Sequence, residues 1–104
     1  MITIKQYDTG IGIKVTLTNE DGAVDLTDAT VLFFMGSNVI YPVVTDADKG
    51  ELLVVFERKH TAKTGRQRAE FRVTHSDNRV ESFPSDSYLE VNIMQHLGGE
   101  HHGR

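Results

Sequence analysis

The chain has 104 residues, of which 38% are hydrophobic and 25% are charged, and its net charge is −4. These values predict one globular domain large enough to have its own core, and they exclude a disordered chain. The lack of cysteine excludes a disulfide framework and a thiolate metal site, and the acidic balance gives no general attraction to nucleic acid or to an anionic membrane.

The beginning of the chain alternates apolar and polar residues and lacks the basic start and apolar core of a signal peptide. The longest apolar run, residues 31–35, is far shorter than the ~20 residues that cross a bilayer. We therefore expect a chain that is made in the cytoplasm and stays there, or is assembled there into something larger.

Short runs with strand periodicity follow one another along the chain, separated by turn residues. Residues 19–22, Asn-Glu-Asp-Gly, predict a tight turn, and residues 57–66 have room for a single helical turn. No amphipathic helix of useful length is present, so the pattern indicates an all-β sandwich. The strands that we expect are residues 3–8, 13–18, 31–35, 39–44, 51–57, 68–75, 80–83 and 88–95.

Residues 31–35 are all apolar, which predicts a strand that is covered on both faces or partly covered by a partner. If alternate residues from Val31 face the core, Leu32 and Phe34 point to the opposite face. An exposed apolar patch there would mark an interface. The alternative is that Tyr41, Leu53 or a loop covers it. In the next expected strand, Pro42 predicts a sheet edge or a bulge.

Three segments of the chain are informative through their order and spacing. The first combines the Asp-Gly turn at 21–22 with Asp-Leu-Thr-Asp-Ala-Thr-Val at 25–31 and an aromatic-rich strand. The second runs from Val-Thr-Asp at 44–46 to Lys-Gly-Glu at 49–51. The third joins Thr-Gly at 64–65, Ala-Glu-Phe-Arg-Val at 69–73 and Phe-Pro-Ser at 83–85. Each motif alone is only turn chemistry and a strand. Their order and spacing together resemble the N-terminal domain of phage baseplate upper proteins.

This resemblance implies an immunoglobulin-like antiparallel β-sandwich of about seven to nine strands. It also implies a virion structural protein that anchors a longer chain to the central hub of the tail, while downstream regions hold receptor-binding proteins. We expect residues 1–95 to form the domain and residues 96–104 to form a flexible tail or the start of a linker. The sequence departs from the family by stopping at Arg104, so it is either a truncated form or a free-standing version.

Two groups of residues have some features of metal sites. Asp46, Asp48 and Glu57 have a spacing similar to that of a calcium loop, but the glycine needed at its sixth position is replaced by Glu51. A solvated hairpin tip explains them better. His96, Glu100, His101 and His102 cluster among glycines that deny a zinc or nickel ion rigid ligands. We expect no metal and no cofactor.

Six of the eleven basic residues lie in one short segment: Arg58, Lys59, Lys63, Arg66, Arg68 and Arg72. They suit an acidic protein surface, nucleic acid or simply a solvated face. No exposed aromatic residue is evident between them for base stacking, which disfavours nucleic acid.

No nucleophile elbow, cysteine nucleophile or phosphate loop is present, so we predict that the chain is not an enzyme. The leading hypothesis is an assembly module of a phage or prophage tail baseplate that binds other tail proteins and is oligomeric in the particle, without contacts to nucleic acid or membrane. The alternative is a carbohydrate-binding or adhesin-like sandwich that uses Tyr7, Tyr41 and Tyr88. The candidate interface consists of Leu32, Phe34, Arg58, Lys59, Arg66, Arg68 and Arg72.

Overall fold

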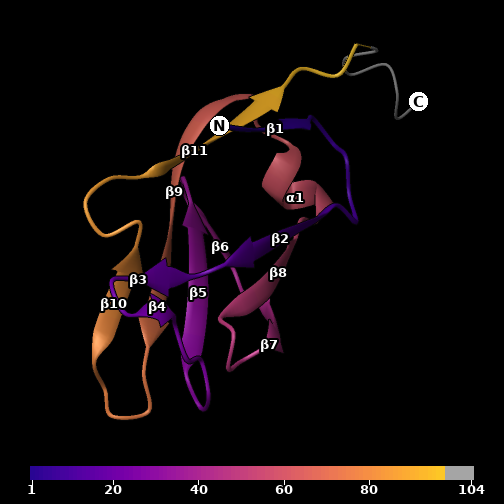
Figure 1. Cartoon of the computed structure of the whole chain (residues 1–104). Helices are drawn as coiled ribbons and strands as arrows, with labels where there is room; N and C mark the ends of the chain where they lie inside the picture. The colour runs from indigo at the N-terminus through magenta and orange to yellow at the C-terminus, as the bar shows by residue number, and fades with distance from the viewer. Residues whose placement is uncertain (98–104) are drawn as a thin grey trace.

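The computed structural model describes residues 1–97, which form β-strands and one short helix (Figure 1). The elements are β1 (Ile2–Lys5), β2 (Gly12–Thr16), β3 (Thr18–Asn19), β4 (Gly22–Ala23), β5 (Thr30–Met35), β6 (Asn38–Ile40), β7 (Val43–Asp46), β8 (Glu51–Val55), α1 (Arg58–Thr61), β9 (Gly65–Thr74), β10 (Val80–Phe83) and β11 (Leu89–Met94). No helix in this part of the chain is both long and apolar enough to cross a membrane.

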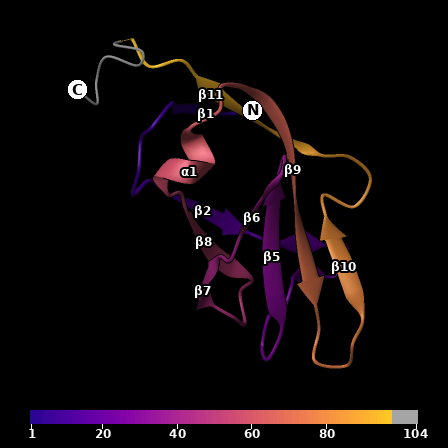
Figure 2. The ribbon, with the colours of Figure 1, turned by 180° about the vertical axis from the view of Figure 1, so that it is seen from behind.

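The larger sheet is organised around β9, the longest strand, and has the order β1-β11-β9-β5-β6. The second half of β9 pairs with β5 on one edge and with β10 on the other. Its first half pairs with β11, which leaves β10 and β11 sharing one edge of the same strand. Figure 2 shows β5, β9 and β10 side by side.

The smaller sheet has the order β2-β8-β7, and a separate hairpin joins β3 to β4. The core lies between the two sheets and consists of the apolar side chains that alternate with polar ones along each strand. Phe33 and Phe71 of the larger sheet lie with ring centroids 4.6 Å apart, and Phe56 meets Phe33 edge to face at 6.4 Å. The contact between Phe56 and Phe33 joins the two layers, because Phe56 directly follows β8 of the smaller sheet.

Gly50 is the point where β8 meets the β3–β4 hairpin. The carbonyl of Gly50 accepts a hydrogen bond from Leu17 N at 2.9 Å, and Leu17 O in turn accepts one from Val24 N at 3.0 Å. The backbone of Gly50 has φ +67°, and a Cβ atom there would lie 2.7 Å from Leu17 O. Only glycine combines that backbone conformation with such a close approach.

The helix α1 closes one end of the sandwich, beside the loop that follows β1 (Figure 1). Gln6 is buried there, and its Nε2 donates to Ala62 O at 2.8 Å while its Oε1 accepts from His96 N at 3.3 Å. The Thr61 hydroxyl donates to Asp8 O at 2.9 Å. One amide side chain therefore connects the first loop, the end of α1 and the segment that leaves β11.

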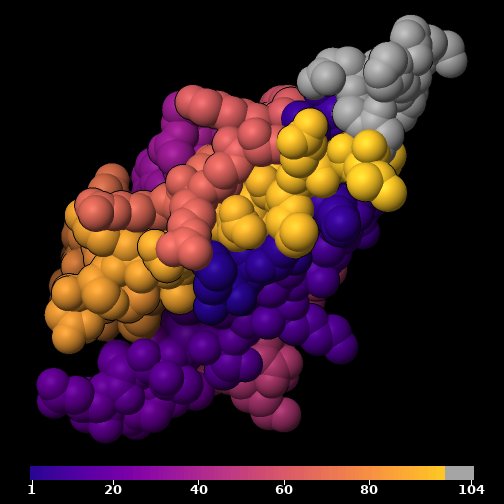
Figure 3. Space-filling view, turned by 90° about the horizontal axis from the view of Figure 1, so that it is seen from above, coloured from indigo at the N-terminus to yellow at the C-terminus, as the bar shows by residue number. Residues whose placement is uncertain are grey.

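The structure confirms the all-β fold, with eleven strands among residues 1–97, and adds one parallel pair, β1 with β11. Figure 3 shows these two strands next to each other, β1 in indigo and β11 in yellow.

The prediction of a single strand at residues 39–44 is wrong. The chain breaks at Tyr41 and Pro42 into β6, which joins the larger sheet, and β7, which joins the smaller one. Pro42 has no N–H to donate to a ladder, which suits a crossing between sheets.

The predicted tail at residues 96–104 lies outside the described residues, apart from His96 and Leu97. Glu100, His101 and His102, which were weighed and rejected as metal ligands, lie in that part of the chain too.

Candidate interface on the outer face of the larger sheet

The outer face of the larger sheet carries the two apolar side chains that the sequence singled out. Val31, Phe33 and Met35 of β5 are buried, whereas Leu32 and Phe34 are partly buried on the opposite face. The side chains of Leu32 and Phe34 are therefore neither fully exposed nor fully covered. Tyr41, one of the proposed covers, is itself 74% exposed.

Arg72 of β9 partly covers this apolar pair. It lies opposite Leu32 in the ladder, and its guanidinium carbon is 4.8 Å from the centroid of the Phe34 ring. The guanidinium also lies 3.7 Å from Glu70 Oε2. A guanidinium over an aromatic face is a favourable arrangement that leaves the rest of the charge available to solvent or to a partner.

Val39 of β6 extends the apolar strip, because it lies opposite Phe34 in the ladder and is 44% exposed. Across the sheet, β9 places Arg66, Arg68, Glu70 and Arg72 on the same outer face, since residues two apart along a strand point the same way. The surface thus combines an apolar strip with a charged margin, which is how protein interfaces are usually composed.

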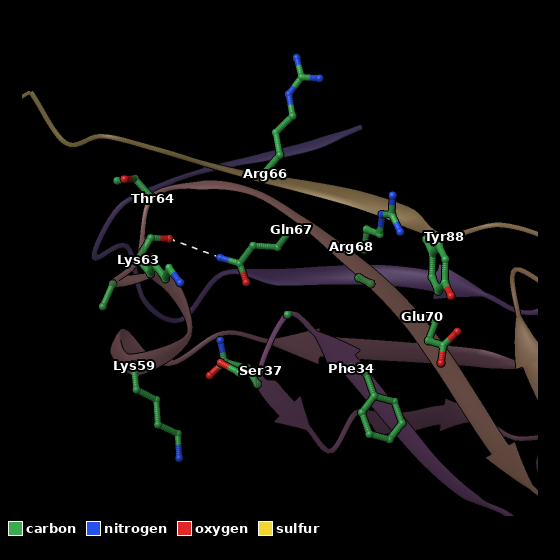
Figure 4. Close-up of a pocket in the computed structure, with 14 residues that line it drawn as sticks. Phe34, Ser37, Lys59, Lys63, Thr64, Arg66, Gln67, Arg68, Glu70 and Tyr88 are labelled. Carbon is green, nitrogen blue, oxygen red and sulfur yellow. Dashed lines mark hydrogen bonds between the residues drawn. The ribbon is translucent and has the colours of Figure 1, made fainter.

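A groove of about 720 Å³ adjoins this face, where the first half of β9 passes α1 and the turn between β5 and β6 (Figure 4). Its cationic residues are Lys59, Lys63, Arg66 and Arg68, and its aromatic residues are Phe34 and Tyr88. Lys59 comes from α1, whose first turn is fixed by a 2.9 Å hydrogen bond from Glu57 N to Nδ1 of the buried His60. Burial lowers the pKa of His60, which keeps its ring neutral and able to accept that bond.

The charges around the groove are unbalanced. Glu70 is its only lining carboxylate among the described residues, and Arg72 already pairs with it. Arg68 lies over the Tyr88 ring, 5.3 Å from its centroid. Within residues 1–97, no ion pair engages the remaining cations, Lys59, Lys63 and Arg66. The groove therefore presents net positive charge on a chain whose net charge is −4.

The fold brings together Phe34, Lys59, Arg66 and Arg68 of the predicted interface, with Leu32 and Arg72 adjacent along the same sheet. Arg58 is not among the groove residues. Its guanidinium carbon is 4.3 Å from the centroid of the Tyr7 ring, in the loop after β1. The helical turn of α1 places Arg58 beside Tyr7 and its neighbour Lys59 at the groove.

Sequence reasoning named Tyr88 only for the glycan-binding alternative and missed its place beside the basic residues. Tyr88 lies 19 residues after Ala69 but lines the same groove as that residue. The expectation that no exposed aromatic accompanies the basic residues was therefore wrong, because Tyr88 is 55% exposed beside Arg68. Only the pairing of β11 with β9, where Leu89 lies opposite Ala69, places it there. No local signal in the sequence identifies that pairing.

The other candidate constellations have structural explanations. Asp46 ends β7 at a hairpin tip, where its carboxylate accepts a 3.4 Å hydrogen bond from Lys49 N, as the hairpin interpretation predicted. Among residues 1–97, no three histidine, aspartate or glutamate side chains are grouped as metal ligands. The tyrosines expected of a glycan platform are dispersed, with Tyr7 under Arg58, Tyr88 at the groove, and Tyr41 between β6 and β7.

Comparison with known proteins is consistent with this architecture. The chain matches the family profile of the BppU N-terminal domain over residues 1–85. It is similar to the solved N-terminal domain of phage TP901-1 ORF48, with a TM-score of 0.70 over 90% of this chain and 84% of that chain, at 15% sequence identity. At this identity the likeness shows a shared fold. No curated protein sequence matches the chain.

Proposed function

Because this chain belongs to the family of baseplate upper protein (BppU) N-terminal domains, and is thus a structural component of a phage tail baseplate, we propose that it anchors a baseplate assembly to a central tail protein. The domain acts by presenting a rigid surface, with no turnover and no cofactor. The proposal extends to multiple copies in the assembled particle, to synthesis in the host cytoplasm before assembly, and to the absence of contacts with nucleic acid or membrane.

The observation that carries the proposal is the partly buried pair Leu32 and Phe34 on the outer face of β5. A strand in the middle of a sheet has little reason to place two large apolar side chains away from the core unless that face meets another surface. Arg72 covers Phe34 only from one side. A partner that packs on the strip completes the burial of both side chains and surrounds them with the charged margin of β9.

The proposed interface therefore has an apolar centre, Leu32 and Phe34, and a cationic rim, Lys59, Arg66, Arg68 and Arg72. Arg58 is retained only as a peripheral candidate, because it lies over Tyr7 and not at the groove. Aromatic and arginine side chains of this kind contribute most of the binding free energy in many protein interfaces.

The test measures complex formation between the chain and the central tail protein from the same genome, by light scattering and isothermal titration calorimetry. We expect a complex of fixed stoichiometry, and we expect Phe34→Glu to abolish it. Val55→Glu is the matched control, since Val55 is an apolar residue 39% exposed on β8 of the smaller sheet. Circular dichroism checks that both variants remain folded.

Two outcomes contradict the proposal. One is a wild-type chain that does not bind the tail protein. The other is a folded Phe34→Glu variant that binds as tightly as Val55→Glu.

A further inference from the structure

One stretch of β9 has a free backbone edge inside the groove. The ladder between β5 and β9 ends at the pair Met35 and Ala69, followed by a last hydrogen bond of 3.0 Å from Gly36 N to Arg68 O. Gly36 then adopts φ +57° and the chain turns back into β6. β9 continues beyond this point to Gly65, paired on its other edge with β11. On the edge left by β5, no strand of residues 1–97 takes its place.

The direction of the backbone groups follows from the ladder. Successive residues of an antiparallel strand direct their N–H and C=O groups to alternate edges. Arg68 O bonds to Gly36, on the β5 edge. Arg66, two residues earlier, must therefore direct its N–H and C=O to that same edge, into the groove. One residue of an extended partner chain can bond to both the N–H and the C=O of Arg66, as residues of β5 do further along β9.

The walls of the groove supply charge on both sides of this edge. Lys59 and Lys63 belong to the α1 side, and Gln67 Nε2 donates to Lys63 O at 3.3 Å, which ties that segment to β9 (Figure 4). Arg66 and Arg68 project from the outer face of β9 itself. An extended chain lying along the edge has alternate side chains on its two faces, so it meets cations on both of them.

We propose that this groove binds an extended acidic segment of the partner protein, which pairs with the backbone of Arg66 and places its carboxylates beside Lys59, Lys63 and the arginines of β9. This inference rests on the proposed anchoring function and names the chemistry of the partner. The free edge spans three or four residues, or on the order of 10 Å, which defines the length of the segment. The strand edge favours a peptide over a nucleic acid, because it offers one donor and one acceptor in the geometry of a β-ladder.

The first experiment titrates the ¹⁵N-labelled chain with the acetylated and amidated pentapeptide DVEVD. We expect amide shifts concentrated at Gly36, Gly65, Arg66 and Gln67, and binding that weakens several-fold when salt is raised from about 0.05 to 0.5 M, since the contacts are ionic and exposed. The reversed-charge peptide KVKVK and an oligothymidylate of about twelve nucleotides are the competing probes. Shifts located elsewhere, equal shifts with KVKVK, or tighter binding of the oligonucleotide at these amides would overturn the inference.

The second experiment uses the double variant Lys63→Glu/Arg66→Glu, with Lys14→Glu on β2 of the smaller sheet as the control for a charge reversal outside the groove. We expect the double variant to lose at least tenfold in affinity for DVEVD and for the central tail protein, and the control to lose neither. If the tail protein binds the wild type and the double variant equally, the groove inference is wrong and the anchoring stands. If the tail protein binds neither, the anchoring is wrong, and the peptide titration still decides the chemistry of the groove.

Discussion

Two glycines of this chain form a natural pair for separating backbone conformation from steric contact. Gly50 has φ +67° and Gly10 has φ +71°, so alanine pays nearly the same conformational cost at both. Their surroundings differ. A Cβ atom at Gly50 would lie 2.7 Å from Leu17 O and 2.8 Å from Val24 O, whereas a Cβ atom at Gly10 has nothing within 4 Å. The alanine variants at these two positions therefore differ in crowding alone.

The magnitude follows from those contacts. A left-handed backbone costs alanine about 1–2 kcal/mol, which is the whole effect that we expect for Gly10→Ala. In Gly50→Ala both short contacts are with backbone oxygens, which cannot rotate away. The segment around Leu17 must shift, which weakens the bonds from Leu17 N to Gly50 O and from Val24 N to Leu17 O. At about 1 kcal/mol for each hydrogen bond, Gly50→Ala should lose about 2 kcal/mol more than Gly10→Ala.

Urea unfolding followed by circular dichroism measures this difference, which corresponds to about 8–16 °C in Tm for a domain of this size. The chain contains no tryptophan, so tyrosine fluorescence provides the second probe. The reasoning is refuted if the two alanine variants have free energies of unfolding within about 0.5 kcal/mol of each other.

Three further predictions concern the core, a buried histidine and the closed end of the sandwich. Phe33→Ala should reduce the free energy of unfolding by about 3–5 kcal/mol, because Phe33 is only 2% exposed, whereas Phe34→Ala on the other face should cost less than half as much in the same urea assay. Burial lowers the pKa of His60 below 6.5, so the unfolded chain takes up this proton at a higher pH than the folded chain. The stabilising effect of neutral His60 on the fold is therefore complete above pH 6.5 and is lost as the pH falls through the lowered pKa. His60→Asn should flatten that part of a profile of unfolding free energy against pH. An unchanged slope contradicts this assignment. Gln6→Leu should lower the free energy of unfolding by about 1–3 kcal/mol, because it leaves Ala62 O without its donor. The same variant should speed hydrogen exchange at the amide of His96. Unchanged exchange there would show that the Gln6 contact does not hold the segment after β11.

Much of the fold is encoded in the two-residue alternation of the strands. The strands β5, β9 and β11 were expected within three residues of their observed bounds, because each has apolar side chains at every second position and turn residues at its ends. The same alternation places Arg66, Arg68 and Arg72 on one face, although the sequence singled out the basic segment only for its density of basic residues. It fails at Arg58, where the strand period no longer applies and the helical turn directs the side chain to Tyr7.

The features that could not be predicted from the sequence depend on pairing between strands that are far apart in the chain. The groove exists because β5 ends at Met35 while β9 continues to Gly65, and no local pattern reports the relative lengths of two strands so far apart in the chain. The split at Pro42 is similar, since the residues 39–44 read as one strand until each half is assigned to its own sheet. The register of β11 against β9, which delivers Tyr88 to the groove, is the third case.

The parallel pairing of β1 with β11 has a mechanical consequence. Both strands run in the same direction, with Ile2 opposite Val91 and Lys5 opposite Met94. A pulling force applied at residues 1 and 97 therefore drags the two strands past each other along their length. All the hydrogen bonds of the pair are loaded at once in shear, whereas an antiparallel hairpin pulled at its open end separates one bond at a time. The β1–β11 pair therefore resists tension along the line between these two points better than a hairpin pulled at its open end would.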